Sequence, residues 1–483
     1  MVRQSSRKSA QAKTTVAESR TRVENNEVKE VKEVLATSIK VNGIETEVGP
    51  ESKVAVTKKS RVPKRKAAPA ELDGNGEEAA EDKDEAGDQL QGAKKPAAKK
   101  RKTTSKKEAE NSMPLAARTA VASLKRAMYI GAHVSGAGGV QNAIQNATHI
   151  GANAFALFLK SQRKWASPPL ADEAKVQFHA MLKQHDYDSR KHILPHGSYL
   201  VNLAQADDAK ATQAFDSFLD DMQRCEALGI TLYNFHPGST GGATMDSACA
   251  RIAAQLNKAH KATSSVVTVL ENMCGSGNVV GSRFEELRDI IALVDDKSRV
   301  GVCLDTCHAF AAGYDLRTPE AFAKTMAEFD SVIGMKYLRA FHINDSKAPF
   351  GSHRDLHANI GTGFLGLRAF HNIMNYAPLQ GLPMVLETPI DEKGPDGKTV
   401  ENKQIWADEI KLLESLIGMD VESAEFKEKE QELQAKGEAE RQKIQDQVDK
   451  KADKDAKKAA KAKGKGKRKK KEEESCDSCD ESD

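Results

Sequence analysis

The sequence lacks any apolar run long enough to cross a lipid bilayer, which takes about 20 residues in a row. Its N-terminus has no apolar segment typical of secretion signals, and its seven cysteines are scattered along 483 residues. We therefore expect an intracellular protein with reduced thiols and no membrane partner. The acid-poor start, which contains Ser and Arg, leaves a mitochondrial presequence open.

Aromatic residues are also few, at 5% of the chain, and they are scarcest at its two ends. Residues 1–126 and 419–483 are rich in Lys, Glu and Ala, so they cannot bury enough apolar surface to offset the entropy lost on ordering. We predict disordered N- and C-terminal tails, with residues 421–456 as a solvated helix that has no sustained apolar stripe. All 13 histidines and both tryptophans lie between the tails, and 127–418 is the predicted folded domain.

The net charge of +3 is unevenly distributed along the chain. Residues 128–418 carry 27 Lys and Arg against 32 Asp and Glu, so the basic excess lies in the tails. Lys/Arg clusters stand at 63–66, 94–107 and 457–471, a pattern typical of nuclear import signals or nucleic-acid contacts. We predict a nuclear protein whose clusters bind an import receptor; the plainer alternative is that the lysines only keep the tails soluble.

Eight short apolar runs bounded by turn signals recur within the folded domain, at 129–135, 154–159, 192–197, 232–238, 266–272, 300–308, 338–345 and 383–389. The stretches between them, such as 171–185, 211–229 and 284–296, have apolar residues at helical spacing. Eight strand–helix repeats in under 300 residues predict an α/β fold, the TIM (β/α)8 barrel. A doubly wound open sheet is the alternative, and it is disfavoured because no GxGxxG loop follows the first strand.

Imidazoles and carboxylates stand at nearly every predicted strand end, where a TIM barrel has its active site. They are His133, His196, His236, Glu271, Asp305 with His308, His342 and Glu387, and the loop after the seventh strand adds Asp355 and His357. So many polar groups would be costly to desolvate unless cations lay among them. We therefore predict a metal site, with the neighbouring Cys303 and Cys307 as small core residues.

The ligand types narrow the choice of metal. Imidazole with carboxylate and no organised thiolate favours Zn²⁺, and Mn²⁺ or Fe²⁺ fit less well. Without His133, five histidines and four acids remain, which suit two or three ions if one carboxylate bridges. Closely spaced divalent ions lower the pKa of water and neutralise a departing oxygen, which is typical of phosphodiester hydrolysis.

Several segments, in their order along 128–418, resemble the endonuclease IV family of apurinic/apyrimidinic (AP) endonucleases: IGAHVS, QRKW, LPHGSYLVNL, LYNFHPGS, VGVCLDTCHAFAAGYDLRT, FHINDSK, HANIGTG and VLETP. The resemblance implies a monomeric TIM barrel with three zinc ions, Mn²⁺ being an alternative at one site. Its substrate would be double-stranded DNA in base excision repair. It would cut on the 5′ side of an abasic site to leave a 3′-hydroxyl, and remove blocked 3′ ends by a 3′-phosphodiesterase activity.

The resemblance also implies roles for individual residues. His196, His236 and Glu271 would hold one zinc ion, and Glu271 would bridge to a second ion held by Asp305, His342 and Glu387. His308, Asp355 and His357 would hold the third, and Glu271 and Glu387 would be the catalytic acids.

Three further residues match family positions that enter the minor groove and help flip out the damaged nucleotide, namely Arg163, Tyr199 and Leu200. The alternative for Tyr199 and Leu200 is core packing at a strand exit. Gly197 departs from the family, in which an acid often follows this histidine, and this puts a contact to His196 in doubt.

Two rival functions remain open. Sugar isomerases share a similar barrel and bind divalent metals, but they favour carboxylate-rich sites and lack the QRKW and HGSYL segments. A DNA-binding scaffold without activity is disfavoured because no ligand position is substituted.

Overall fold

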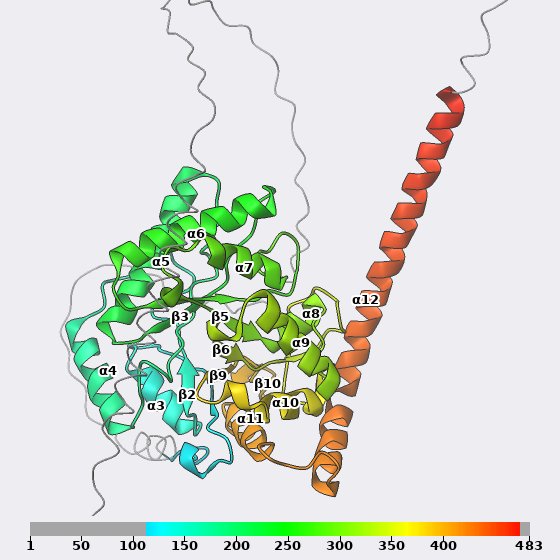
Figure 1. Ribbon diagram of the computed structural model, residues 1–483. Coiled ribbons are helices and arrows are strands. Elements are labelled where there is room, and N and C mark those ends of the chain that lie inside the picture. Colours follow the sequence, from blue (N-terminus) through cyan, green and yellow to red (C-terminus); the bar gives the residue numbers. More distant parts are fainter. Residues whose placement is uncertain (1–112, 474–483) are drawn as a thin grey trace, which may run out of the picture. The chain divides into compact units, whose positions relative to one another are not determined.

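The computed structural model describes the backbone of residues 113–473 and the side chains of residues 113–454 (Figure 1). The basic clusters at 63–66 and 94–107 lie outside the described residues, as do the side chains of 457–471. The same holds for most of the predicted N-terminal tail and for the end of the C-terminal one.

Seven parallel strands form one curled sheet in the order β2-β1-β9-β6-β5-β4-β3. Their bounds are β1 Tyr129–His133, β2 Ala154–Ala156, β3 Leu232–Phe235, β4 Val267–Glu271, β5 Val300–Asp305, β6 Leu338–His342 and β9 Pro383–Leu386. The last strand, β9, pairs with the first, β1, so the sheet curls round on itself. Each of the seven matches a predicted run.

The third predicted run, 192–197, closes the ring between β2 and β3. Ile193 bridges Phe155 of β2, and His196 bridges Asn234 of β3, both in parallel. Pro195 has no N–H to donate, which explains why this segment makes bridges rather than an uninterrupted ladder. Together with the segment 192–197, the seven strands form an eight-membered barrel wall, so the predicted TIM fold is confirmed.

The barrel interior is filled by small and branched side chains, one from almost every strand: Ala156, Leu194, Leu232, Val269, Cys303, Ala340 and Val385. This layer lies below the strand ends, so the floor of the barrel mouth is apolar. Cys303 is therefore a core residue, as its place two positions before Asp305 predicts.

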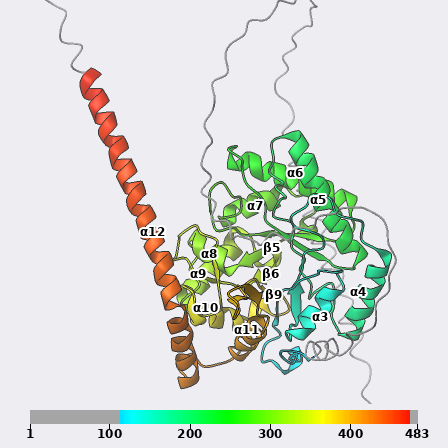
Figure 2. The same ribbon diagram turned by 180° about the vertical axis from the view of Figure 1, so that it is seen from behind.

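Helices cover the outside of the sheet (Figures 1 and 2). They are α3 Asn142–His149, α4 Asp172–Gln184, α5 Asp208–Ala227, α6 Met245–Ala262, α7 Phe284–Leu293, α8 Thr306–Ala312, α9 Pro319–Val332, α10 Gly366–Met374 and α11 Gln404–Ser415. The long helix α12 Ala424–Glu473 packs beside α10 and extends away from the barrel. Two small ladders add β7 Asp345–Ser346 with β8 His357–Ala358, and β10 Asp391–Lys393 with β11 Thr399–Glu401. Within the described part of the chain, no helix is long and apolar enough to span a membrane.

The C-terminal segment forms the predicted helix, α12, which is largely exposed but has one face packed on the barrel. Its Phe426 is fully buried against His371 of α10, and Glu430 forms a two-pronged ion pair with Arg368 at 2.9 and 3.1 Å. The large apolar residues of the first half, Phe426, Leu433, Ile444 and Val448, follow at spacings of seven, eleven and four, which places them on one helix face. One face of this helix therefore packs on α10 at the outside of the barrel.

Candidate metal centre

The structure brings all nine predicted ligands together at the carboxyl ends of the strands. Glu271, Asp305 and His342 are the last residues of β4, β5 and β6; His196, His236 and Glu387 stand at or just past strand ends; His308 is in the first turn of α8; and Asp355 and His357 lie before and at the start of β8. The potential ligand atoms fall into overlapping groups within 4.8 Å of one another.

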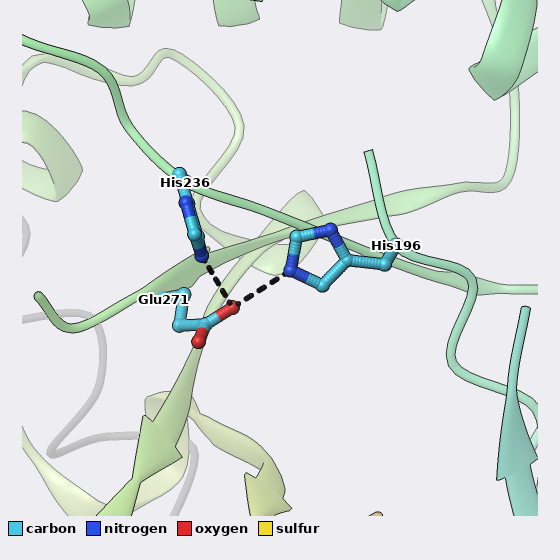
Figure 3. A group of neighbouring side chains, drawn as sticks. All are labelled: His196, His236 and Glu271. Atoms are coloured by element: carbon cyan, nitrogen blue, oxygen red, sulfur yellow. Dashed lines mark hydrogen bonds and ion pairs between the residues drawn. The ribbon is translucent and has the colours of Figure 1, made fainter. Parts of the chain in front are cut away.

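In the first group, two imidazoles point at one oxygen of Glu271 (Figure 3). Nε2 of His196 lies 3.2 Å from Oε2 of Glu271, and Nε2 of His236 lies 3.6 Å from the same atom. Ligand atoms at the corners of a tetrahedron around zinc are about 3.3 Å apart, given bonds of about 2.0–2.1 Å. The spacing of this group fits one such ion.

The other oxygen of Glu271 faces a second group. Nδ1 of His342 lies 3.1 Å from Oε1 of Glu271, 3.2 Å from Oε2 of Glu387 and 3.9 Å from Oδ2 of Asp305. Because its two oxygens look into two ligand groups, Glu271 has the geometry of a bridging carboxylate.

The third group lies at the more open edge of the mouth. Asp355, whose side chain is 44% exposed, approaches Nε2 of His308 at 3.1 Å and Nε2 of His357 at 3.3 Å with its two oxygens. Cys307 is also within reach of Asp355 and His357, but its thiol donates to the carbonyl of Leu356. Burial raises the pKa of the Cys307 thiol, so it stays protonated, in line with its prediction as a core residue.

Backbone carbonyls orient three of the imidazoles. Nδ1 of His196 donates to the carbonyl oxygen of Gly197 at 2.8 Å. In the same way, Nδ1 of His308 donates to the carbonyl of Asn272 at 2.9 Å, and Nδ1 of His357 donates to that of Glu387 at 3.2 Å. A neutral ring with its proton on Nδ1 presents the lone pair of Nε2 to the carboxylates, as a metal ligand must.

The absence of an acid at Gly197 has a steric reason. A Cβ atom there would lie 2.9 Å from the hydroxyl of Tyr233 and 3.0 Å from Cβ of Phe235, so no side chain fits without movement. Tyr233 is fully buried, and its hydroxyl donates to Asp221. The contact to His196 comes instead from the carbonyl of Gly197 itself.

Sequence reasoning missed three asparagines that hold the carboxylates. Asn234 donates to Oε2 of Glu271 at 2.6 Å, and Asn344 donates to Oδ2 of Asp305 at 2.7 Å. Asn272 accepts from the backbone N–H of Asp305 at 2.6 Å. Each is a polar residue within two positions of a ligand in an otherwise apolar run, a signal that was present in the sequence.

His133 ends β1 without joining the predicted ligands. Its Nδ1 lies 3.2 Å from Oε1 of Glu387, and its ring packs on Phe158 at a centroid distance of 4.5 Å. It therefore positions Glu387. A cleft of about 1170 Å³ opens beside it, lined in part by the loops 134–141 and 158–162.

Charges inside the centre balance one another strongly. Burial by itself would raise the pKa of Glu271, but the His342 and His236 imidazoles outweigh it and hold the pKa well below its usual range. Burial likewise opposes ionisation of His308, yet Asp305 and Asp355 raise its pKa well above the usual value. The pKa of Asp355 falls to about 2, because the His308 charge outweighs its burial. The carboxylates thus stay ionised, and the imidazoles or bound cations balance their charge.

Two histidine nitrogens without hydrogen-bond partners in the described part of the chain mark a place where a cation would bind. Within residues 113–454, Nε2 of His308 and of His357 make no hydrogen bond, although carboxylate oxygens lie within 3.3 Å. A cation must lie between each of these nitrogens and its carboxylate, and either a proton on the ring or a bound metal ion meets that need. The residues present therefore fit divalent ions bound by imidazole and carboxylate.

The predicted DNA-contacting residues lie beside this centre. Tyr199 and Leu200 are 56% and 39% exposed, which argues against core packing, and the Tyr199 ring lies over His196 at a centroid distance of 5.1 Å. Arg163 is exposed on the loop 160–168, and Ser198 joins the two loops by donating to the carbonyl of Gln162 at 2.8 Å.

Comparisons with known proteins identify the family to which this chain belongs. Residues 144–416 match the family model described as the xylose isomerase-like TIM barrel. The chain is 48% identical over 305 residues to apurinic-apyrimidinic endonuclease 1 of Saccharomyces cerevisiae, covering 63% of this chain and 79% of that protein. It is 52% identical over 289 residues to probable endonuclease 4 of Campylobacter curvus, covering 60% and 98%. The crystal structure of endonuclease IV from Thermus thermophilus is similar, with a TM-score of 0.51, 30% identity, and coverage of 60% and 99%.

Proposed function

Because this chain belongs to the endonuclease IV family of AP endonucleases, we propose that its barrel cuts DNA 5′ to abasic sites with three zinc ions and also clears blocked 3′ ends. As a family member it is a metal-dependent DNA repair hydrolase. The observation that carries the finer proposal is the two-sided approach of Glu271 to two ligand groups. The names of the relatives favour this activity over sugar isomerisation.

The residues divide the work as the resemblance implies. His196 and His236 hold one ion with Glu271; Asp305, His342 and Glu387 share the second with Glu271; and His308, Asp355 and His357 hold the third. Bound divalent ions supply an activated water at neutral pH and neutralise charge on the departing oxygen. Glu271 keeps two sites close together, and Mn²⁺ is the alternative at one site.

Recognition of the lesion falls to the exposed side chains at the rim. Tyr199 and Leu200 offer apolar surface that can enter an unstacked step, and Arg163 offers a charge for the minor groove. An abasic nucleotide has no base to unstack, so a wedge costs least at that position. The partner is therefore double-stranded DNA with an abasic site or a blocked 3′ end, bound by a monomer.

A nicking assay combined with metal analysis tests the proposal. Purified full-length protein should contain close to three zinc ions by mass spectrometry and should nick a duplex once, 5′ to an abasic analogue. Magnesium chelation should leave this activity intact, and prolonged zinc stripping should abolish it. Correctly folded, zinc-loaded protein that leaves the duplex uncut would refute the proposal.

We place the protein in the nucleus, with mitochondria open as a second destination, because of its basic clusters. Deletion of 60–107 and 457–471 from a fluorescent fusion should disperse it through the cell. Unchanged nuclear accumulation would refute import by these clusters.

A further inference from the structure

The helix α12 contacts the loop that carries two of the candidate ligands. Glu440 pairs with Lys347 at 3.3 Å, and Gln447 accepts a hydrogen bond from Arg354 at 3.2 Å. Both partners lie between β6 and β8, in the segment that contains Asp355 and leads to His357. The helix therefore reaches the rim of the candidate metal centre at residue 447.

The next loop is held by the same helix. Gln434 donates to the carbonyl oxygens of Gly361 and Gly363 at 2.7 and 3.1 Å, and Arg441 donates to the carbonyl of Thr362 at 2.5 Å. At Gly437 the contact is so close that a Cβ atom would lie 1.9 Å from the carbonyl oxygen of Thr362. A glycine inside a helix is unfavourable, but here only a residue without a side chain lets the backbone of α12 approach the backbone of the loop 361–363 so closely.

The helix continues past this contact into a strongly basic stretch. Residues 450–471, called here the basic stretch, contain thirteen Lys and Arg and two Asp, and α12 extends to Glu473. As a helix these 22 residues span about 33 Å, close to the roughly 34 Å of one turn of B-DNA. The match to the family model ends at residue 416, so the basic stretch is outside it.

From these observations we propose that the basic stretch is a second DNA-binding element, which contacts phosphates of the duplex flanking the abasic nucleotide. It starts three residues after the Arg354–Gln447 contact, so it is tethered beside the proposed active site whatever its orientation. Tethering at the rim gives it a high effective concentration toward DNA already in the mouth. The proposal rests on the proposed function, and it assigns the basic stretch a role in substrate binding besides nuclear import.

Charge removal in the full chain tests this proposal. Six lysines of the basic stretch are changed to Gln: Lys457, Lys458, Lys461, Lys463, Lys465 and Lys467. Each phosphate contact contributes about 0.9 to the slope of log K against log salt concentration. For a duplex of about three turns, we expect the slope to fall by about 3 to 5 units and KM at moderate salt to rise at least tenfold, with kcat unchanged. A fall of less than two units overturns the proposal.

Two controls separate the possible causes. The same number of lysines is changed to Gln in the N-terminal extension, at Lys94, Lys95, Lys99, Lys100, Lys102 and Lys106. If the salt dependence of binding by this variant falls as much as that of the basic-stretch variant, the total positive charge of the chain explains the effect and the proposal fails. On a duplex of about one turn, which offers few flanking phosphates, all three proteins should nick alike. If the unsubstituted protein does not nick this short duplex, the proposed function is refuted instead. If the variant of the basic stretch binds DNA normally but no longer enters the nucleus, the stretch is an import signal alone.

Discussion

Nε2 of His308 lies 3.1 Å from Oδ2 of Asp355, yet no hydrogen bond joins these two atoms. On the other side of the ring, Nδ1 donates to the carbonyl of Asn272, so Nε2 is the nitrogen that faces the acid. A cation is needed between Nε2 and the carboxylate, and either a proton on the ring or a divalent ion can supply it. Asp355 is therefore the acid whose removal should affect a single ion.

The change Asp355→Asn should remove one of three ions and leave the fold intact, because Asp355 is partly exposed and contacts only the third ligand group. We expect about one zinc less per chain by mass spectrometry and a loss of at least 100-fold in nicking rate. Asp391→Asn, on an exposed hairpin strand, is the matched control and should keep all ions. A full complement of zinc in the Asp355 variant would contradict the assignment.

The change Glu271→Ala should cost more metal than Asp355→Asn, because the two oxygens of Glu271 face different ligand groups. We expect two ions to be lost or weakened and nicking to fall below detection, while circular dichroism shows the barrel intact. Retained nicking would overturn the bridging role. Loss of only one ion would reduce Glu271 to an ordinary ligand.

The change Tyr199→Ala should weaken binding to abasic duplex more than to a frayed 3′ end, because only the intact duplex needs a wedge to open it. We expect KM for the abasic duplex to rise about tenfold, with a smaller change in kcat. Tyr199→Phe keeps the ring over His196 and His236 and should behave like the unsubstituted protein. An equal loss on both substrates would argue against a wedge.

The barrel and its mouth were predictable because both depend on local patterns. Continuous apolar runs identified the strands, and a charged side chain at the end of a buried run, such as Glu271 or Asp305, marks the catalytic face of a TIM barrel. Their convergence follows from the topology, since all parallel strands end on the same side. The assignment to ions remained an implication of the resemblance, because spacing along the chain does not give distances.

Other features depend on contacts that are distant in sequence. The positions of Asn234 and Asn344 beside ligands are visible in the sequence, but their partners are not, because the acid that each amide contacts comes from a different strand. The packing of α12 was missed because its sparse apolar residues do not form a full stripe, and a barrel surface needs fewer of them than a coiled coil does. From the sequence alone, Gly437 only weakens a helix. In the structure, its lack of a side chain lets the backbone of α12 contact the carbonyl of Thr362.

Glu409 should make stability depend on pH in the weakly acidic range. Burial raises its pKa to about 7, even though Thr388 and the N–H of Ile360 donate hydrogen bonds to it. A carboxyl with a raised pKa stabilises the fold when protonated, so its contribution is complete below about pH 4.5 and is lost as the pH rises to about 7. Glu409→Gln does not titrate, so its stability relative to the unsubstituted protein should increase over this window, by roughly 3 kcal/mol. Urea unfolding at several pH values measures this difference, and a difference independent of pH would contradict it.

The change Gly437→Ala tests whether α12 is docked as described, because intrinsic propensity and packing predict opposite results. Alanine favours a helix over glycine by about 1 kcal/mol, so an undocked α12 would become more stable. In the docked helix the new methyl group would lie 1.9 Å from the carbonyl oxygen of Thr362, so the helix must move away. We expect the amides of residues 424–447 to lose protection from hydrogen exchange, together with those of the loop 361–363. Glu438→Ala, at the next and exposed position, places the same side chain on the helix without the clash and should keep the protection. Greater protection in the Gly437 variant would show that α12 stands free of the barrel, and the basic stretch would then lose its fixed place beside Asp355.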